Sequence, residues 1–410
     1  MILGGNFGNG ANSGSRASNW NNAASNSNGN IGARGCCDDR LWLCVGYGRA
    51  GRLLQRWSAR TTCFGEYIAR FGRAGSRRSK PAAGFLMGKK HRNLIGRVVD
   101  EANLRLALQQ AARGKRRSVG YLEFKEYEPL NLARLGEEIA AGAYHPAPPH
   151  QFVVFEPKRR VISAPTFRDR VAQHALVNVI GPILDAGLLP RAYACREGRG
   201  THAAVIALQA DMRRLGAPLY ALKTDFSRFF PSIDRATLTR LIAKKITCAA
   251  TLDLVETITP PDGVGLPIGA LTSQIYANVY AGQVDRLLQC DLKRRFWYRY
   301  MDDIVVLGRS SERLREVKDR IEAFSLAELG LKFSHWSVAP ISRGVNFLGY
   351  RIWPTHKLLR RQSVRRARKR LRELQSVGDD EALAMFRAAW LGHAQWADSH
   401  HLLKSLGLET

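Results

Sequence analysis

Hydrophobic positions recur along the chain with two periods, one typical of helices and one typical of strands. Helical spacing of apolar residues predicts helices over residues 103–114, 130–144, 168–185 and 311–330. Short apolar runs bounded by polar turns predict strands or strand pairs over residues 152–166, 218–225, 296–308 and 344–353. The chain after residue 353 is predicted to be helical, with a very basic first helix within residues 356–377.

The first 86 residues lack both periods. They are rich in Asn, Gly and Ser and then in Arg and Gly, with nine Asn among residues 1–30. They hold 12 Lys and Arg against 3 Asp and Glu. Because such a composition buries little apolar surface, residues 1–86 are predicted to be a low-complexity, disordered leader. The patterned part of the chain begins at Met87.

Composition and charge narrow the range of partners. The formal net charge is +28, which favours a polyanionic partner such as nucleic acid. A ribosomal or chromatin-like packing protein is the alternative that charge alone leaves open.

The seven Cys have no zinc-site spacing and are interpreted as reduced thiols of a cytosolic protein. We find no signal peptide and no apolar run long enough to span a membrane, so we expect a cytoplasmic protein without a membrane partner.

Three aspartates stand at the polar ends of predicted strands. Asp302 and Asp303 lie at the tip of the strand–turn–strand unit, in YMDD, and Asp225 ends the apolar run LYALKTD. Two adjacent acids at a hairpin tip repel each other, so we expect a cation nearby. Three carboxylates with two divalent ions suit in-line phosphoryl transfer, and Mg²⁺ prefers carboxylate and phosphate oxygens. An acidic pair that only caps a turn is the alternative.

At YMDD the chain resembles the catalytic hairpin of reverse transcriptases. Other segments resemble further motifs of that family, in the family's order. They are PKRRVISAPTFRDRVAQHAL (157–176) for the fingers hairpin and its helix, YACREGRGTHAAV (193–205) for a segment of group II intron enzymes, KTDFSRFFPSID (223–234) for the first palm motif, IGALTSQIYAN (268–278) for the template-side palm motif and NFLGYRI (346–352) for the primer-grip hairpin.

The resemblance implies an α+β fold of the right-hand polymerase type, with fingers, a palm built on an antiparallel sheet and a helical thumb. It implies an N-terminal extension and fingers over residues 87–217, a palm over 218–353 and a basic thumb over 354–410. The implied reaction is RNA-templated addition of deoxynucleotides to a 3′-hydroxyl with two Mg²⁺ ions, for which Mn²⁺ can substitute. Asp225 and Asp302 would bind both ions, with Asp303 and the backbone carbonyl of Phe226 in support.

Two segments match family positions that contact the incoming nucleotide. The basic fingers hairpin, with Lys158, Arg159 and Arg160, would neutralise the triphosphate. A solvated charge cluster is the alternative for these residues. Phe230 would block the space of a ribose 2′-hydroxyl and so select deoxynucleotides, the alternative being a core Phe.

The segment IGALTSQ indicates a subfamily. Most reverse transcriptases have Gln-Gly at its start and Ser-Pro at its end, whereas this chain has Ile268–Gly269 and Ser273–Gln274. This form resembles the enzymes of diversity-generating retroelements, which copy a template-repeat RNA and misincorporate at its adenines. We assign Gly269, Ser273 and Gln274 to the nucleotide pocket. We hypothesise that the Gln amide and the backbone donor gained without Pro change fidelity.

Two further segments are predicted to hold nucleic acid. Tyr300 and Met301 of the catalytic turn, and Leu348, Gly349 and Tyr350 of the primer grip, match contact positions of the family. The basic helix has nine Lys and Arg and one Glu between residues 357 and 376. We expect one face of it to track a duplex backbone without reading bases, the alternative being a solvated face. That face comprises Arg361, Arg365, Arg368, Lys369 and Arg372.

One position departs from the family pattern. The family often has a Lys after the palm helix that is proposed to protonate pyrophosphate, and Ser337 stands at that place here. Lys332 and His335 are candidates for the role, but neither is assigned to the catalytic set.

The resemblance also suggests an origin for the Asn-rich leader. In diversity-generating elements the template repeat lies next to the reverse transcriptase gene, and its adenine-rich codons read as Asn. Residues 3–35 resemble a translated variable repeat of a lectin-like protein, so residues 1–86 would be template repeat and spacer read in frame. The expected partners are template-repeat RNA, a cDNA or DNA primer, deoxynucleotides and a small basic accessory variability protein. The element would be bacterial or phage-encoded.

Two other functions stay open. One is a group II intron-type or defence-associated bacterial reverse transcriptase, against which IGALTSQ and the lack of a nuclease or zinc module after the primer grip argue. The other is a non-catalytic RNA-binding protein on a polymerase scaffold, against which the three intact acids argue. The template RNA, target protein, priming mode, error rate and oligomeric state do not follow from the sequence.

Overall fold

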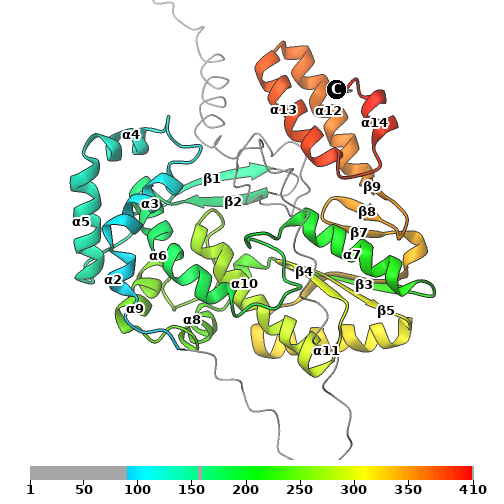
Figure 1. Cartoon of the computed structure of the whole chain (residues 1–410), viewed down its shortest axis with the longest axis horizontal. Coiled ribbons are helices and arrows are strands. Elements are labelled where there is room, and N and C mark those ends of the chain that lie inside the picture. The colour runs from blue at the N-terminus through cyan, green and yellow to red at the C-terminus, as the bar shows by residue number, and fades with distance from the viewer. Residues whose placement is uncertain (1–89, 156–158, 409–410) are drawn as a thin grey trace, which may run out of the picture. The chain divides into compact units, whose positions relative to one another are not determined.

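The computed structural model of the protein describes residues 90–155 and 159–408 (Figure 1). The predictions for the leader, residues 1–86, and for Lys158 lie outside these residues. Helices and strands alternate in groups, and the strands of each sheet pair antiparallel. In the described part of the chain, no helix is both long and apolar enough to cross a membrane.

Helices dominate the N-terminal region. The long helix α6 contacts α2, α3 and α4, and α5 packs on α3 and α4. Leu104, Leu135 and Val171 are among the apolar residues fully buried between these helices, which agrees with the helical periods predicted for this region. The five elements are α2 (Ile95–Val98), α3 (Glu101–Ala111), α4 (Val119–Glu126), α5 (Glu128–Ala140) and α6 (Phe167–Asp185).

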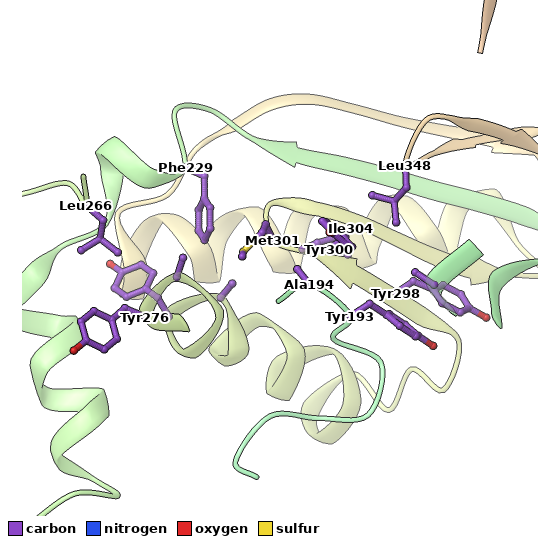
Figure 2. Close-up of a cluster of buried hydrophobic side chains, with 14 of the residues drawn as sticks. Tyr193, Ala194, Phe229, Leu266, Tyr276, Tyr298, Tyr300, Met301, Ile304 and Leu348 are labelled. Carbon is purple, nitrogen blue, oxygen red and sulfur yellow. The ribbon is translucent and has the colours of Figure 1, made fainter. Parts of the chain in front are cut away.

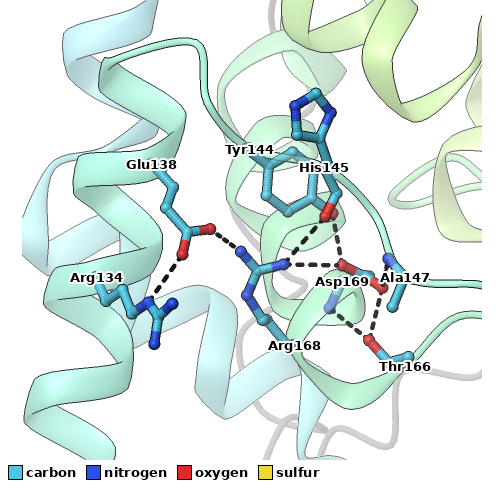
Figure 3. A network of polar contacts seen from close by, with 8 residues as sticks. All are labelled: Arg134, Glu138, Tyr144, His145, Ala147, Thr166, Arg168 and Asp169. Carbon is cyan, nitrogen blue, oxygen red and sulfur yellow. Dashed lines mark hydrogen bonds and ion pairs between the residues drawn. The ribbon is translucent and has the colours of Figure 1, made fainter.

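A buried carboxylate fixes the start of α6 (Figure 3). Asp169 is 1% exposed and accepts hydrogen bonds from the Tyr144 hydroxyl (2.8 Å), the Ala147 amide (3.0 Å) and the Thr166 hydroxyl (2.6 Å). Thr166 is the N-cap of α6, and its hydroxyl oxygen accepts from the Asp169 amide. Burial and the nearby Asp169 carboxylate raise the pKa of Tyr144. The network therefore ties the chain leaving α5 to the helix that follows the fingers hairpin.

The hairpin predicted within residues 152–166 is confirmed. Strand β1 (His150–Phe155) pairs with β2 (Arg159–Ala164), from His150↔Ala164 to Phe155↔Arg159. The amide of Ser163 in β2 also donates to the carbonyl of Ile268 (2.8 Å), which joins the hairpin to the loop before α10.

A four-stranded antiparallel sheet, called the palm sheet below, has the strand order β4-β5-β3-β6. The predicted strands at 218–225 and 296–308 are confirmed, but β6 was not predicted. Ser334 and His335 of β6 are polar and exposed, so this strand lacks a clear apolar period. The strands are β3 (Tyr220–Phe226), β4 (Trp297–Tyr300), β5 (Asp303–Gly308) and β6 (Phe333–Pro340).

Helices cover and connect this sheet. Helix α11 contacts β3, β5 and β6, α7 contacts β4, and α10 contacts α6, α8 and α11. The charged amphipathic helix predicted at 311–330 corresponds to α11. The elements are α7 (Thr201–Leu215), the turn η2 (Phe230–Ser232), α8 (Arg235–Ala243), α9 (Ala249–Ile258), α10 (Leu271–Arg286) with its extension η3 (Leu287–Asp291), and α11 (Ser311–Leu329).

A small three-stranded sheet precedes the C-terminal helices. A short turn η4 (Ile341–Arg343) leads into β7 (Val345–Phe347), β8 (Tyr350–Ile352) and β9 (Lys357–Leu359). The basic helix predicted within 356–377 begins only at Arg361, because residues 357–359 pair with β8 instead. The helices are α12 (Arg361–Val377), α13 (Asp380–Ala394) and α14 (His400–Ser405).

Candidate active site

Asp225 and Asp303 lie directly opposite each other on neighbouring strands. The antiparallel register of β3 and β5 runs from Tyr220↔Gly308 to Asp225↔Asp303. Facing residues of antiparallel strands project to the same side of a sheet, so the two carboxylates share one face. Both are buried, Asp225 at 8% and Asp303 at 2% exposure. Because like charges directly opposite destabilise a strand pair, each carboxylate needs polar partners.

The structure supplies a different partner for each carboxylate. The Lys223 ammonium donates to both carboxylate oxygens of Asp303, each at 3.0 Å. The Ser334 hydroxyl donates to Asp225 Oδ2 at 2.8 Å. Neither Lys223 nor Ser334 was predicted as a site residue from the sequence. Lys223 precedes Asp225 by two positions, and strand alternation places such residues on the same face, so this signal was present in the sequence.

Asp302 occupies the turn between β4 and β5. Tyr300 pairs with Asp303 and closes a two-residue turn of Met301 and Asp302, as predicted. Met301 has φ +54°, a left-handed conformation that costs a non-Gly residue about 1–3 kcal/mol unless its surroundings hold it. The Met301 side chain is 7% exposed and lies in a cluster of buried hydrophobic residues with Phe229 and Tyr300 (Figure 2). Packing of Met301 therefore holds the turn that presents Asp302.

The three aspartates have carboxylate oxygens suited to binding a divalent metal, although the three side chains do not converge on one point. Among residues 90–155 and 159–408, no three His, Cys, Asp or Glu side chains converge on a point that could hold an ion. The donor set nevertheless fits: carboxylate oxygens from two facing strand ends and the adjoining turn are hard ligands of the kind that Mg²⁺ and Mn²⁺ accept. Asp225, Asp302 and Asp303 are the side chains that would hold such ions.

A comparison with known proteins identifies a domain that contains the three aspartates. Residues 155–352 match the family model described as "Reverse transcriptase (RNA-dependent DNA polymerase)". Residues 155–352 form a reverse transcriptase domain. Such a domain is an RNA-directed DNA polymerase, a nucleotidyltransferase, and generally uses divalent metal ions. The match extends from the end of β1 to the end of β8 and includes all three aspartates, and the antiparallel palm sheet is that of a right-hand polymerase.

Bacterial relatives resemble the chain at low identity. Protein YkfC of Escherichia coli (strain K12) is 22% identical over 285 residues, which cover 57% of this chain and 72% of the relative. The group II intron-encoded protein LtrA of Lactococcus lactis subsp. cremoris is 23% identical over 235 residues, which cover 52% of this chain and 39% of the relative.

Among solved structures, telomerase proteins of two yeasts are similar. The apo telomerase of Candida tropicalis has a TM-score of 0.44 and 12% identity, covering 65% of this chain and 58% of that one. The telomerase of Candida albicans in complex with a fragment of telomeric RNA has a TM-score of 0.41 and 10% identity, covering 65% and 64%.

The residues predicted to contact the nucleotide come from three parts of the reverse transcriptase domain. Arg159 is exposed and Arg160 half-buried, and both start β2 at the turn end of the β1–β2 hairpin. Phe226 is buried at the end of β3, and the half-buried Phe230 begins the turn η2, with its ring edge-on to Phe229 at 5.6 Å between centroids. Whether these residues meet at a bound nucleotide stays a prediction.

The segment IGALTSQ lies where the β1–β2 hairpin contacts the loop before α10. Gly269 has φ +122°, and a Cβ there would lie 2.9 Å from the carbonyl oxygen of Ser163 in β2. Ser273 is buried in the first turn of α10. Gln274 is half-buried, and its side-chain oxygen lies 3.5 Å from Cys195 Sγ. Gly269 is thus required by the close approach of two backbones.

The predicted primer-grip residues form a second tight turn. Phe347 pairs with Tyr350, so Leu348 and Gly349 make a two-residue turn with φ of +49° and +89°. The side chains of Leu348 and Tyr350 are buried, as are those of Tyr300 and Met301 in the catalytic turn. We therefore expect any contact of these residues with nucleic acid to involve main-chain atoms.

Helix α12 separates its charged and apolar sides as predicted. Ala367, Leu371 and Leu374 are buried, whereas the five predicted basic residues are exposed. Glu373 lies 3.7 Å from Lys369 and 3.5 Å from Arg370, so part of the positive charge is locally paired. The exposed residues are Arg361, Arg365, Arg368, Lys369 and Arg372.

Proposed function

We propose that the protein copies a template-repeat RNA into cDNA within a diversity-generating retroelement, with misincorporation at template adenines. The observation that carries the polymerase part is the facing pair Asp225–Asp303 with Asp302 in the adjoining turn. The subfamily part is supported by Ile268–Gly269 and Ser273–Gln274 in the loop and first turn of α10. In this proposal residues 87–217 serve as fingers, 218–353 as palm and 354–410 as thumb.

Each group of residues has a defined task in the proposed reaction. Two Mg²⁺ ions, when bound, lower the pKa of the primer 3′-hydroxyl and stabilise the leaving pyrophosphate. The carboxylates that would hold these ions are those of Asp225, Asp302 and Asp303. Arg159 and Arg160 neutralise the triphosphate, as Arg residues do in other phosphoryl transferases. The exposed face of α12 binds the phosphates of the template–primer duplex, which gives affinity without base readout.

A second candidate is a group II intron-type enzyme. It is favoured by the similarity to the intron-encoded protein LtrA. The two functions differ in fidelity and in template, because only the diversity-generating enzyme concentrates its errors at adenines. The accessory variability protein belongs to the first proposal alone, as a basic partner of the polymerase.

The deciding experiment sequences the cDNA that the full chain makes. The protein would receive RNA transcribed from its adjoining locus, deoxynucleotides, Mg²⁺ and the accessory protein encoded there. Changes concentrated at template adenines support the proposal. Uniformly faithful cDNA would remove the diversity-generating role and keep the polymerase. No cDNA despite intact RNA binding would favour a non-catalytic RNA-binding protein.

Matched variants connect the activity to the carboxylates. Asp302→Asn should lower primer extension by more than about a hundredfold while duplex binding stays near that of the wild type, because the carboxylate acts on the reacting centre. The control is Asp253→Asn, which changes an exposed carboxylate on α9 and should leave extension unchanged.

A further inference from the structure

Lys223 joins two segments that are far apart in the sequence. An ammonium group has three N–H donors, and here three acceptors surround it. They are the two carboxylate oxygens of Asp303, each at 3.0 Å, and the carbonyl oxygen of Asn346 at 2.7 Å. Asp303 belongs to the catalytic hairpin, and Asn346 in β7 is the first residue of the predicted primer-grip segment 346–352. The Lys223 side chain is 16% exposed and lies 5.9 Å from the centre of the Phe347 ring.

The strand register explains how one side chain reaches both segments. Lys223 lies opposite Val305 on β5 and Ser337 on β6, and Asp225 lies opposite Asp303 and His335. The same face of the palm sheet therefore carries the two carboxylates in one row and Lys223 in the next. From there the ammonium group is diagonal to Asp303, and the β7 main chain lies above the same face. The positive charge offsets the repulsion between the facing acids.

We propose that Lys223 is a positioning residue that couples the primer-side hairpin β7–β8 to the catalytic carboxylates. The proposal rests on the proposed polymerase function, in which a primer 3′-hydroxyl must meet the carboxylate site in line. A misplacement of about 1 Å in such a site lowers rates by about a hundredfold. Because one ammonium group binds both Asp303 and the main chain of Asn346, a displacement of the hairpin is transmitted to the carboxylate. Lys223 acts through these groups and need not touch the substrate.

The test compares Lys223→Met with Lys223→Gln and Lys223→Arg. Met removes the positive charge and all N–H donors. Gln removes the charge but keeps an amide donor, so it tests the same coupling if the Met variant fails to fold. Arg keeps a cation with several donors. In single-turnover extension of a DNA primer on an RNA template, the Met and Gln variants should lose at least about tenfold in rate. Their Kd for nucleotide and for duplex should change by less than about twofold, since neither is bound by Lys223. Arg should restore part of the rate.

Lys318→Met is the matched control. Lys318 on α11 also contacts two carboxylates, Asp319 and Glu322, and lies 4.7 Å from the centre of the Trp336 ring. It touches neither catalytic hairpin nor primer grip, so its loss should leave the extension rate unchanged. A wild-type rate in folded Met or Gln variants of Lys223, or an equal loss in Lys318→Met, would overturn the proposal.

Hydrogen exchange separates this inference from the proposed function. Loss of Lys223 should speed amide exchange in residues 345–352 and 300–304, whereas Lys318→Met should not. If the wild-type protein extends no primer, the proposed function fails, but exchange still decides the coupling. Unchanged exchange in both segments of the Lys223 variants would then overturn it.

Discussion

Arg299 and Asp285 form a fully buried, bidentate ion pair that also holds the catalytic turn. Both side chains are 0% exposed, and Arg299 Nε and Nη2 each lie 2.7 Å from an Asp285 oxygen. Arg299 Nη1 further donates to the side-chain oxygen of Asn278 (2.9 Å) and to the carbonyl of Met301 (3.2 Å). Burial raises the pKa of Asp285, and the charge of Arg299 limits that rise. One guanidinium therefore anchors the YMDD turn to helix α10.

Breaking this pair should be costly. Arg299→Met leaves the Asp285 carboxylate buried without its cation, which should lower the free energy of unfolding by about 3–5 kcal/mol. Urea denaturation followed by circular dichroism measures this. Arg315→Met is the control, because the Arg315–Glu312 pair is exposed at 3.7 Å and should contribute no more than about 1 kcal/mol. A small loss for Arg299→Met would show that water or a shifted side chain replaces the guanidinium.

A side chain at position 269 should not be tolerated. Gly269 has φ +122°, and a Cβ would lie 2.9 Å from the Ser163 carbonyl oxygen and 3.1 Å from Ile162 Cγ2. Gly269→Ala should therefore destabilise the protein by about 2 kcal/mol or more and raise the KM for nucleotide. Gly96→Ala is the comparison, since nothing lies within 4 Å of its added Cβ. Equal urea midpoints for the two variants would contradict the close approach of β2 and the α10 loop.

Phe230 should set the choice between deoxynucleotides and ribonucleotides. It is half-buried, whereas its neighbour Phe229 is 3% exposed and belongs to the core. Phe230→Val should raise the relative kcat/KM for ribonucleotides by about tenfold or more, because the steric block to a 2′-hydroxyl is removed. Phe229→Leu should lower stability without changing that ratio. Competition between a deoxynucleotide and its ribonucleotide in primer extension measures the ratio, and an unchanged value in Phe230→Val would refute the assignment.

The exposed face of α12 should produce the salt dependence of duplex binding. Neutralising Arg365, Arg368 and Arg372 to Gln together should reduce the slope of log K against log[salt] by about 2–3, because each phosphate contact releases counterions. Fluorescence anisotropy at several salt concentrations gives this slope. The same number of charges removed on α11, at the exposed Arg313, Arg315 and Arg320, provides the control. Identical slopes for the two triple variants would mean that net charge, rather than the face of α12, attracts the duplex.

His174 should make the protein less stable in mild acid. Burial, with the nearby charges of Arg170 and Arg113, lowers the pKa of His174 from 6.5 to about 4. Between pH 6.5 and 4 the unfolded chain binds a proton at His174 that the folded protein does not bind. The contribution of neutral His174 to stability is therefore complete above about pH 6.5 and falls as the pH drops toward 4. His174→Gln should remove up to about 3 kcal/mol of this dependence. Urea midpoints at pH 7 and pH 4.5 test it, with the exposed His401→Gln expected to behave like the wild type.

The sequence by itself determined many of the helices and strands, and it placed acidic residues at the ends of two strands. Apolar spacing located the fingers hairpin, the helices α3, α5, α6 and α11 and the two strands that carry the aspartates, because these patterns depend only on residues close in the chain. The YMDD turn and the basic face of α12 were likewise visible. The strands β6 and β9 were not, since β6 is a polar edge strand and the three residues of β9 are too few to show a period.

Only the tertiary structure decided which distant groups meet. Asp225 faces Asp303 because β3 pairs with β5, and the strand order β4-β5-β3-β6 is set by packing of the whole sheet. Lys223 reaches Asn346 across 123 positions, and Arg299 reaches Asp285 in a site from which water is excluded. Such contacts arise when long loops close and buried polar groups must find partners, which no local pattern of apolar residues encodes.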